Sequence, residues 1–193
     1  MVILGITGGI GSGKSTISEI FKLLDIPTYI ADVESKKLTA TSPVIREKLI
    51  EEFGDDLYEG TTLNKVLLAS YIFNDKNKLE KANKIIHPEV DKHFCSWTEY
   101  HKDQPLVAVE AAILYESGMN RFTDKVAMVY THLEERIRRV MERDNSSREK
   151  IMERINSQMP DEDKKQLADY VIYNDETQSL IKQSLNIISD ILR

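Results

Sequence analysis

The chain has 193 residues and is acidic, with 32 Asp and Glu residues against 26 Lys and Arg residues and a net charge of −6. Hydrophobic residues make up 41% of the sequence, which is enough to bury a core and excludes a disordered or collagen-like chain. The acidic balance argues against nucleic-acid binding through broad electrostatics. Cys95 is the only cysteine, so no internal disulfide can form. The apolar start is too short for a signal peptide or a membrane span, and we expect a cytoplasmic protein that binds no membrane.

Five short apolar runs predict the buried strands of a parallel sheet. They are Val2–Thr7, Pro27–Asp32, Leu106–Glu110, Val126–Tyr130 and Tyr170–Tyr173. Helical spacing of apolar residues after the first run predicts a helix between the first two strands, and strands joined by a helix are parallel. Apolar positions over residues 179–192 predict a closing amphipathic helix. The sequence therefore predicts an α/β fold with a five-stranded parallel sheet.

The segment of residues 33–104 differs in character from the runs on either side of it. It is charged, its apolar spacing is helical and it contains no strand-like run, so we expect a helical insertion. Residues 132–159 are dense in charge and are expected to form a lid. The nucleotide-binding core is then assembled from residues 1–32, 105–131 and 160–193.

Three arginines in the expected lid fall on one stripe of a helix. Arg136, Arg139 and Arg143 lie within about 60° of one another at helical spacing. Three guanidinium groups repel one another unless an anion lies nearby, which favours a phosphate ligand. A solvated helix face with partners such as Glu135 and Glu142 explains the same spacing, and both interpretations stay open.

The segment Gly8–Ser15 matches the phosphate-binding pattern G-x-x-x-x-G-K-[ST]. Its glycines let the backbone wrap closely and aim N–H groups at phosphate oxygens, and the following helix adds its N-terminal dipole. Lys14 supplies a positive charge toward the β and γ phosphates, and the Ser15 hydroxyl can ligate Mg²⁺. The strand before the loop and the helix after it are the context that this motif requires. We therefore expect binding of a nucleoside triphosphate.

Other sequence features narrow the class of nucleotide enzyme. The string nearest to the guanine-reading N-K-x-D segment starts at Asn83 and lacks the Asp, which argues against a GTPase. The third predicted strand ends in Glu110, a candidate to hold metal-bound water. A short core, a helical insertion and an arginine-rich segment favour a small-molecule kinase, in which the insertion holds the acceptor and the lid closes over ATP.

Asp32 is the candidate general base. It ends the second predicted strand, at the edge of a parallel sheet where ligands bind, and a carboxylate there can accept the proton of an attacking hydroxyl. Two alternatives stay open, namely an outer ligand of Mg²⁺ and the N-cap of a helix that begins near Val33.

Taken in order, the motifs resemble the dephospho-CoA kinase family, a family of P-loop small-molecule kinases, along nearly the whole chain. The glycine loop alone is shared by many kinases, and the ordered set is more specific. The matching segments are Gly5–Ser15, Ala31–Asp32, Ile72–Phe73, Ile86–Pro88, Ile113–Glu116, Arg139–Asp144, Arg154–Gln158 and Ala168–Asn174.

The resemblance implies transfer of the γ-phosphoryl group of ATP, with Mg²⁺, to the 3′-hydroxyl of dephospho-CoA, the final step of coenzyme A biosynthesis. It also implies a role for each matching position. The residues expected to bind the phosphates of ATP are Gly11, Ser12, Gly13, Lys14, Ser15 and Thr16. Arg139 and Arg143 are expected in the lid over ATP, and Asn174 is expected next to the adenine. On the acceptor side are Asp32, Lys36, His87 and Leu114, with Lys14 and Asp32 as the catalytic pair and Ser15 on the metal.

The sequence departs from the family pattern at four positions. Lys36 and Lys65 stand where arginine is common, Glu110 stands where aspartate is common, and Ala112 replaces a proline. Lysine lacks the bidentate fork of arginine, so phosphate contacts at the first two positions are expected to be rearranged. Glu116 is either functional or a helix-end charge. Two other functions stay open, a kinase for another nucleotide or metabolite and a non-catalytic protein gated by nucleotide; the sequence sets no oligomeric state.

Overall fold

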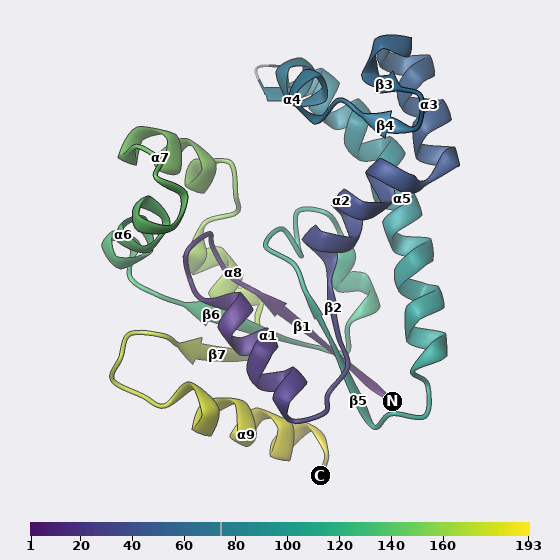
Figure 1. Ribbon diagram of the computed structural model, residues 1–193. Helices are drawn as coiled ribbons and strands as arrows, with labels where there is room; N and C mark the ends of the chain where they lie inside the picture. The colour runs from purple at the N-terminus through teal and green to yellow at the C-terminus, as the bar shows by residue number, and fades with distance from the viewer. Residues whose placement is uncertain (74) are drawn as a thin grey trace. The chain divides into compact units, whose positions relative to one another are not determined.

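The computed structural model describes residues 1–73, of which Phe73 by its backbone only, and residues 75–193 (Figure 1). The chain divides into two compact units. The first consists of Met1–Ile30 and His101–Arg193, and the second of Ala31–Tyr100. Among the described helices, none combines the length and the apolar character that crossing a membrane requires.

A five-stranded parallel sheet forms the centre of the first unit, in the order β2-β5-β1-β6-β7. This confirms the predicted α/β fold. The strands are β1 (Val2–Thr7), β2 (Thr28–Ile30), β5 (Leu106–Glu110), β6 (Lys125–Tyr130) and β7 (Tyr170–Tyr173). Every residue of β5 is buried, as expected for a central strand that is covered on both faces. The parallel register places Glu110 opposite Ile6 and Tyr173 opposite Tyr130.

The helices of the first unit are α1 (Lys14–Leu23), α6 (Leu133–Asp144), α7 (Arg148–Asn156), α8 (Asp161–Leu167) and α9 (Leu180–Ile191), with a short 3₁₀ helix η2 (Met119–Phe122). Of these helices, α1, α8 and α9 pack on the sheet, whereas α6 and α7 pack on each other. The fully buried Ile17 and Phe21 of α1 and the buried Ile187 of α9 pack on Leu4 and Ile6 of β1. Helices α1 and α9 therefore lie side by side on one face of the sheet (Figure 1).

The second unit is mainly helical around its own apolar core. Its elements are α2 (Ala31–Thr41), α3 (Pro43–Phe53), the 3₁₀ helix η1 (Asp55–Leu57), β3 (Tyr58–Glu59), β4 (Thr62–Leu63), α4 (Lys65–Phe73) and α5 (Lys76–Tyr100). One core cluster of this unit consists of the buried residues Ile45, Leu49, Leu57, Tyr58, Leu63 and Leu68. Helix α3 begins where the sequence signals a turn, because the Ser42 hydroxyl accepts a hydrogen bond from the Ile45 N–H and Pro43 fits the first helical turn.

The prediction of a strand-free insertion was wrong at one place. β3 and β4 form an antiparallel hairpin that turns at Gly60, which has a φ of 61°. Each strand has only two residues, so it is too short for the alternation of apolar and polar residues that identifies a strand in sequence.

Substitution of Phe21 tests the packing of α1 on the sheet. Phe21→Ala removes a fully buried ring and is expected to lower the free energy of unfolding by about 3–5 kcal/mol, since the cavity cannot collapse completely. Leu23→Ala on the same helix is the control, because Leu23 is 83% exposed, and should change the free energy by about 0.5 kcal/mol or less. Urea unfolding measures both variants, and equal losses would contradict the assigned packing.

Candidate active site

Polar groups of four chain segments meet at the carboxyl edge of the sheet, because all five strands run in the same direction. The glycine loop follows β1, Thr131 follows β6 and Asn174 follows β7. Glu110 is the last residue of β5 and is only 7% exposed. β2 ends at Ile30, two residues before Asp32. This edge is the place where a ligand of the parallel sheet is expected.

The glycine loop has a backbone that side chains would disrupt. Gly8 and Gly13 have φ values of 148° and 97°, in the region that favours glycine. A Cβ atom on Gly8 would collide with the carbonyl oxygen of Val129, and one on Gly13 would collide with the side-chain amide of Asn174. The loop is therefore wrapped tightly against the ends of β6 and β7.

Helix α1 begins in a way that suits an anion. Its N-cap is Gly13, and among the described residues no side chain caps its first turn, whereas Ser179 caps α9. The first helical residue, Lys14, is 9% exposed, and its Nζ donates a hydrogen bond to the Gly9 carbonyl at 3.3 Å. Ser15 is exposed in the same turn. The N-terminus of α1 thus combines backbone N–H groups without a side-chain cap, the positive end of the helix dipole and the Lys14 ammonium group.

Two residues that follow the ends of β6 and β7 hold the glycine loop by hydrogen bonds. One of them had no predicted role, and the other was expected next to the adenine. The Ser12 carbonyl accepts hydrogen bonds from Asn174 Nδ2 at 2.8 Å and from Thr131 Oγ1 at 2.9 Å. The N–H of Asn174 donates to the Tyr130 carbonyl at 2.8 Å. The side chain of Asn174 therefore holds the glycine loop. Thr131 follows an apolar strand without any motif of its own, so nothing in the sequence identified it.

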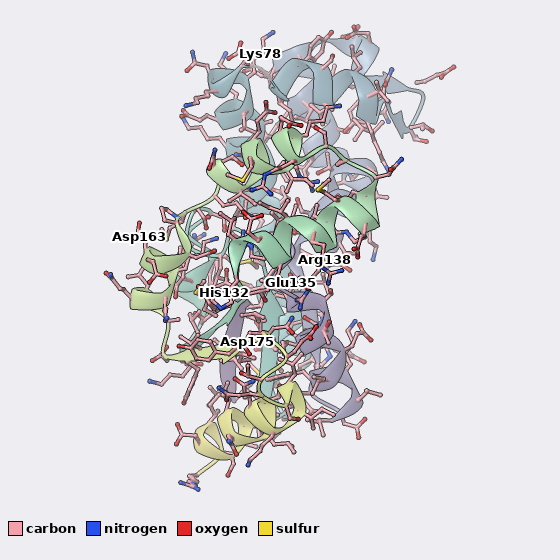
Figure 2. The ribbon with its side chains drawn as sticks, turned by 90° about the vertical axis from the view of Figure 1, so that its left-hand side faces the viewer. Lys78, His132, Glu135, Arg138, Asp163 and Asp175 are labelled. Carbon is pink, nitrogen blue, oxygen red and sulfur yellow. The ribbon has the colours of Figure 1, made fainter. Side chains whose placement is uncertain are left out.

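Arg139 lies beside the loop and is held there by a carboxylate. Its Nε donates to Glu135 at 2.7 Å, and its Nη2 lies 3.5 Å from the Asn174 carbonyl. Hydrogen bonds from Arg138 and, second, from Arg139 lower the pKa of Glu135 to about 2, so this carboxyl is charged at any working pH. Figure 2 shows Glu135 and Arg138 on α6.

The three arginines of the predicted stripe have separate surroundings. The exposed Arg143 donates to Asp144 at 2.7 Å, and hydrogen bonds from Arg143 and then Arg154 lower the pKa of Asp144 to about 2. Arg136, in contrast, is buried below the glycine loop. Each arginine of the stripe has a carboxylate partner: Asp161 for Arg136, Glu135 for Arg139 and Asp144 for Arg143. Repulsion within the stripe thus requires no bound anion.

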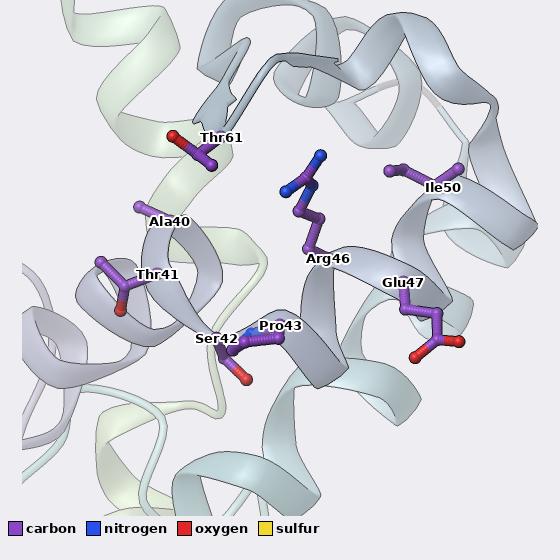
Figure 3. A pocket seen from close by; sticks show the side chains of 8 residues that line it. All are labelled: Ala40, Thr41, Ser42, Pro43, Arg46, Glu47, Ile50 and Thr61. Carbon is purple, nitrogen blue, oxygen red and sulfur yellow. The ribbon is translucent and has the colours of Figure 1, made fainter.

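Each unit contains a cavity that bears on ligand binding. In the first unit a cavity of about 190 Å³ lies next to the loop support, and its lining is Thr131, His132, Glu135, Arg139, Asp175 and Glu176. In the second unit a cavity of about 610 Å³ lies between α2, α3 and Thr61. Figure 3 shows Arg46 extending toward the middle of its lining residues, and the Arg46 guanidinium carbon lies 5.5 Å from the centre of the Tyr58 ring.

Three expected acceptor-side residues belong to the second unit. Asp32 is exposed in the first turn of α2, which begins at Ala31, so Asp32 lies inside the helix and is not its N-cap. In the described part of the chain no hydrogen bond or ion pair engages its carboxylate. Lys36 is exposed one turn later on α2, which places the two side chains on the same face. His87 is half-buried in α5.

The structure gives Leu114 and Glu116 places in the fold. Leu114 is fully buried, and its Cδ2 would lie 2.8 Å from a Cβ on Gly5, so it packs in the core instead of reaching a substrate. Glu116 Oε1 accepts hydrogen bonds from the Met159 N–H at 2.7 Å and from Lys164 Nζ at 2.9 Å. The fully buried Lys164 also donates to the Ala112 carbonyl at 2.9 Å. Glu116 thus connects its own segment to Met159 and to Lys164 of α8.

Comparison with known proteins gives one consistent family. The family model described as dephospho-CoA kinase matches residues 2–179. A dephospho-CoA kinase of Bacteroides fragilis is 46% identical over 186 residues, covering 96% of this chain and 91% of the relative. One of Porphyromonas gingivalis is 42% identical over 193 residues, covering 99% and 95%.

Solved structures have the same architecture. A crystal structure of a Thermus thermophilus protein has a TM-score of 0.86 and 30% identity, covering 100% of this chain and 98% of that one. Dephospho-CoA kinase from Campylobacter jejuni has a TM-score of 0.72 and 25% identity, covering 98% and 96%. A shikimate kinase from Acinetobacter baumannii, with a TM-score of 0.54 and 16% identity, shares the fold alone. With the glycine loop at the carboxyl edge of this sheet, these matches show that the chain belongs to the dephospho-CoA kinase family.

Proposed function

We propose that this chain transfers the γ-phosphoryl group of ATP to the 3′-hydroxyl of dephospho-CoA, giving coenzyme A and ADP, as a cytoplasmic enzyme. The activity rests on the family membership given above. The residue roles rest on the geometry of each unit and on the chain order. The single observation that carries the proposal is the first turn of α1 behind the glycine loop, which has no side-chain cap and no acidic residue and begins with Lys14, an arrangement that suits a phosphate group.

The triphosphate is assigned to the loop and α1. Gly11 and Gly13 supply backbone N–H groups, and Ser12 lies between them with its own N–H donating to the Gly9 carbonyl at 3.1 Å. Lys14 supplies charge, and Ser15 and Thr16 follow in the first turn. The small cavity lined by Thr131, His132 and Asp175 suits the nucleoside part of ATP, with Arg139 at its border. The guanidinium groups of Arg139 and Arg143 are assigned to neutralise negative charge on the phosphates.

A divalent cation fits the same place. The exposed Ser15 hydroxyl can hold Mg²⁺, and the buried Glu110 at the end of β5 can hold its water ligands. In the described part of the chain, no group of three or more His, Cys, Asp or Glu residues forms a metal site, which suits a cation bound mainly by phosphate and water. When bound, Mg²⁺ neutralises charge on the β and γ phosphates.

The second unit is assigned to the acceptor. Asp32 follows β2 and its carboxylate accepts the proton of the 3′-hydroxyl while the hydroxyl oxygen bonds to phosphorus and the bond to the ADP oxygen breaks. Lys36, one turn away, and His87 are assigned to acceptor contacts. The cavity with Arg46 has an apolar wall at Ala40 and Ile50, which suits an apolar arm next to an anionic group.

Product analysis tests the reaction against its alternatives. ADP release from Mg-ATP is measured with dephospho-CoA, with a nucleoside monophosphate and with neither, and coenzyme A is identified by mass. We expect ADP release that depends on dephospho-CoA and equals the coenzyme A formed. Preference for the monophosphate would indicate another P-loop kinase, and ATP binding without acceptor-dependent ADP release would indicate a nucleotide-gated binding protein.

Asp32→Asn tests the general base. The amide keeps the size of the side chain but cannot accept the proton, so kcat should fall by about 100-fold or more while the affinity for ATP is retained. Steady-state kinetics and calorimetric ATP binding measure the two quantities, and the exposed Asp103→Asn serves as the control. Unchanged turnover would remove Asp32 from this role.

Arg143→Ala tests the proposed lid. Loss of this guanidinium should lower kcat/KM for ATP by about 10-fold or more, because charge on the phosphates is less neutralised. Arg148→Ala is the matched control, since Arg148 also forms an exposed ion pair, with Glu134, next to the same helix. A wild-type KM and kcat for ATP in Arg143→Ala would show that this residue does not act on the nucleotide.

A further inference from the structure

Ile10, in the middle of the glycine loop, is held by distant residues at three points. Its N–H donates to Gln158 Oε1 at 3.0 Å. Its carbonyl accepts from Arg136 Nε at 2.8 Å. Its side chain packs against the buried Ile137 and Val140 of α6. Position 10 is unspecified in the phosphate-binding pattern, so the motif alone gives no reason for this arrangement.

Arg136 is built into the fold as part of this support. Its side chain is 2% exposed, and its second contact is an ion pair with Asp161 at the start of α8. A buried guanidinium is costly unless its donors are satisfied, so the Ile10 carbonyl and Asp161 together keep it in place. Gly9 adjoins Ile10 and has no positive φ, yet a Cβ atom there would collide with the Arg136 guanidinium. Gly9 thus makes room for Arg136.

Gln158 belongs to a segment that is fixed on both sides. Met159 donates its N–H to Glu116, and Asp161 pairs with Arg136. Gln158 lies two residues after the end of α7, and the residues of α6 and α7 pack together around Ile137 and Ile151. The hairpin of α6 and α7 (residues 133–156) is therefore joined to the glycine loop at its first helix and just beyond its last residue.

We propose that Arg136 and Gln158 are positioning residues that hold the glycine loop through the backbone of Ile10 in the shape that binds ATP, and so couple ATP binding to the α6–α7 hairpin. A loop with positive φ values at Gly8, Gly11 and Gly13 is easily deformed, and two hydrogen bonds on one residue limit that freedom before the nucleotide arrives. The Ile10 N–H is engaged by Gln158, and the Ser12 and Thr16 N–H groups donate to the Gly9 and Gly13 carbonyls. The phosphates are therefore assigned to N–H groups such as those of Gly11, Gly13 and Ser15. This proposal depends on the proposed function only for the choice of ATP as the nucleotide that binds the loop.

Gln158→Leu tests the proposal with little change in size, because it removes the side-chain amide whose Oε1 accepts the hydrogen bond from the Ile10 N–H. Gln166→Leu, an exposed position on α8, is the matched control. We expect the dissociation constant for ATP, measured by calorimetry, to rise about 10-fold in Gln158→Leu, the cost of one hydrogen bond at the site. In the ligand-free protein, peptides that span residues 8–16 should exchange amide hydrogen about 10-fold faster.

Steady-state kinetics distinguish a positioning role of Gln158 from a purely structural role. A positioning role predicts a raised KM for ATP with kcat and the KM for the acceptor within about twofold of wild type. An ATP dissociation constant and loop exchange like those of wild type would overturn the proposal. Parallel losses in stability, acceptor KM and ATP affinity would overturn it too, since they report general damage.

Arg136→Gln gives a second test, because glutamine can still donate to the Ile10 carbonyl but cannot pair its charge with Asp161. We expect a smaller rise in the ATP dissociation constant than in Arg136→Leu. Equal effects in both variants would contradict positioning through Ile10. If the chain did not phosphorylate dephospho-CoA, these two measurements could still be interpreted, because calorimetry and hydrogen exchange need no acceptor.

Discussion

The rest of the active-site structure depends on one electrostatic constraint, the need to place uncapped backbone N–H groups where several negative charges will bind. Helices α3, α7 and α9 begin with a serine that satisfies a first-turn N–H, and α6 and α8, which have no side-chain cap, carry acidic residues in their first turn. Helix α1 has neither feature. α1 instead begins at Gly13, and its first residue is Lys14, whose charge opposes the helix dipole. This arrangement is unfavourable without an anion and favourable with one, which explains why so much of the first unit supports the loop.

That support comes from three parts of the chain that the parallel sheet brings to one edge. Thr131 and Asn174, after β6 and β7, hold the Ser12 carbonyl. Arg136, in the first helix of the α6–α7 hairpin, and Gln158, just beyond its end, hold Ile10. The loop is thus fixed at a residue on each side of Gly11, while the N–H groups that face the ligand remain free of side-chain caps. Rigidity at the supports lowers the entropy that phosphate binding must overcome.

The sequence was sufficient for the features that depend on local pattern. Buried strands such as β1 and β5 are uninterrupted apolar runs, and their predicted bounds match the structure. The glycine loop follows from residue types at fixed spacing. The β3–β4 hairpin was missed because its two-residue strands carry no periodicity. The second strand was predicted to run to Asp32, but β2 ends at Ile30 and α2 begins directly after it, so Asp32 lies inside the helix, neither at the end of a strand nor at the N-cap that was the alternative.

Features that depend on tertiary contacts were beyond sequence patterns. Arg136 looked equivalent to Arg139 and Arg143 on a helical stripe, yet only Arg136 is buried, because α6 packs its face on the loop. Leu114 lies in a segment that resembles the family motif, but its side chain fills the core beside Gly5. Glu116 and Lys164 form an ion pair although they are 48 residues apart in the sequence, and no local sequence pattern predicts that they meet.

The most direct test of the central claim is an NMR titration of the backbone amides with Mg-ATP. The account predicts large shifts for the amides of Gly11 through Thr16, the residues of the loop end and the uncapped turn of α1. It predicts a much smaller shift for the Ile10 amide, which stays bonded to Gln158. Shifts that leave the first turn of α1 unchanged, or an Ile10 amide that responds as strongly as Gly13, would contradict it.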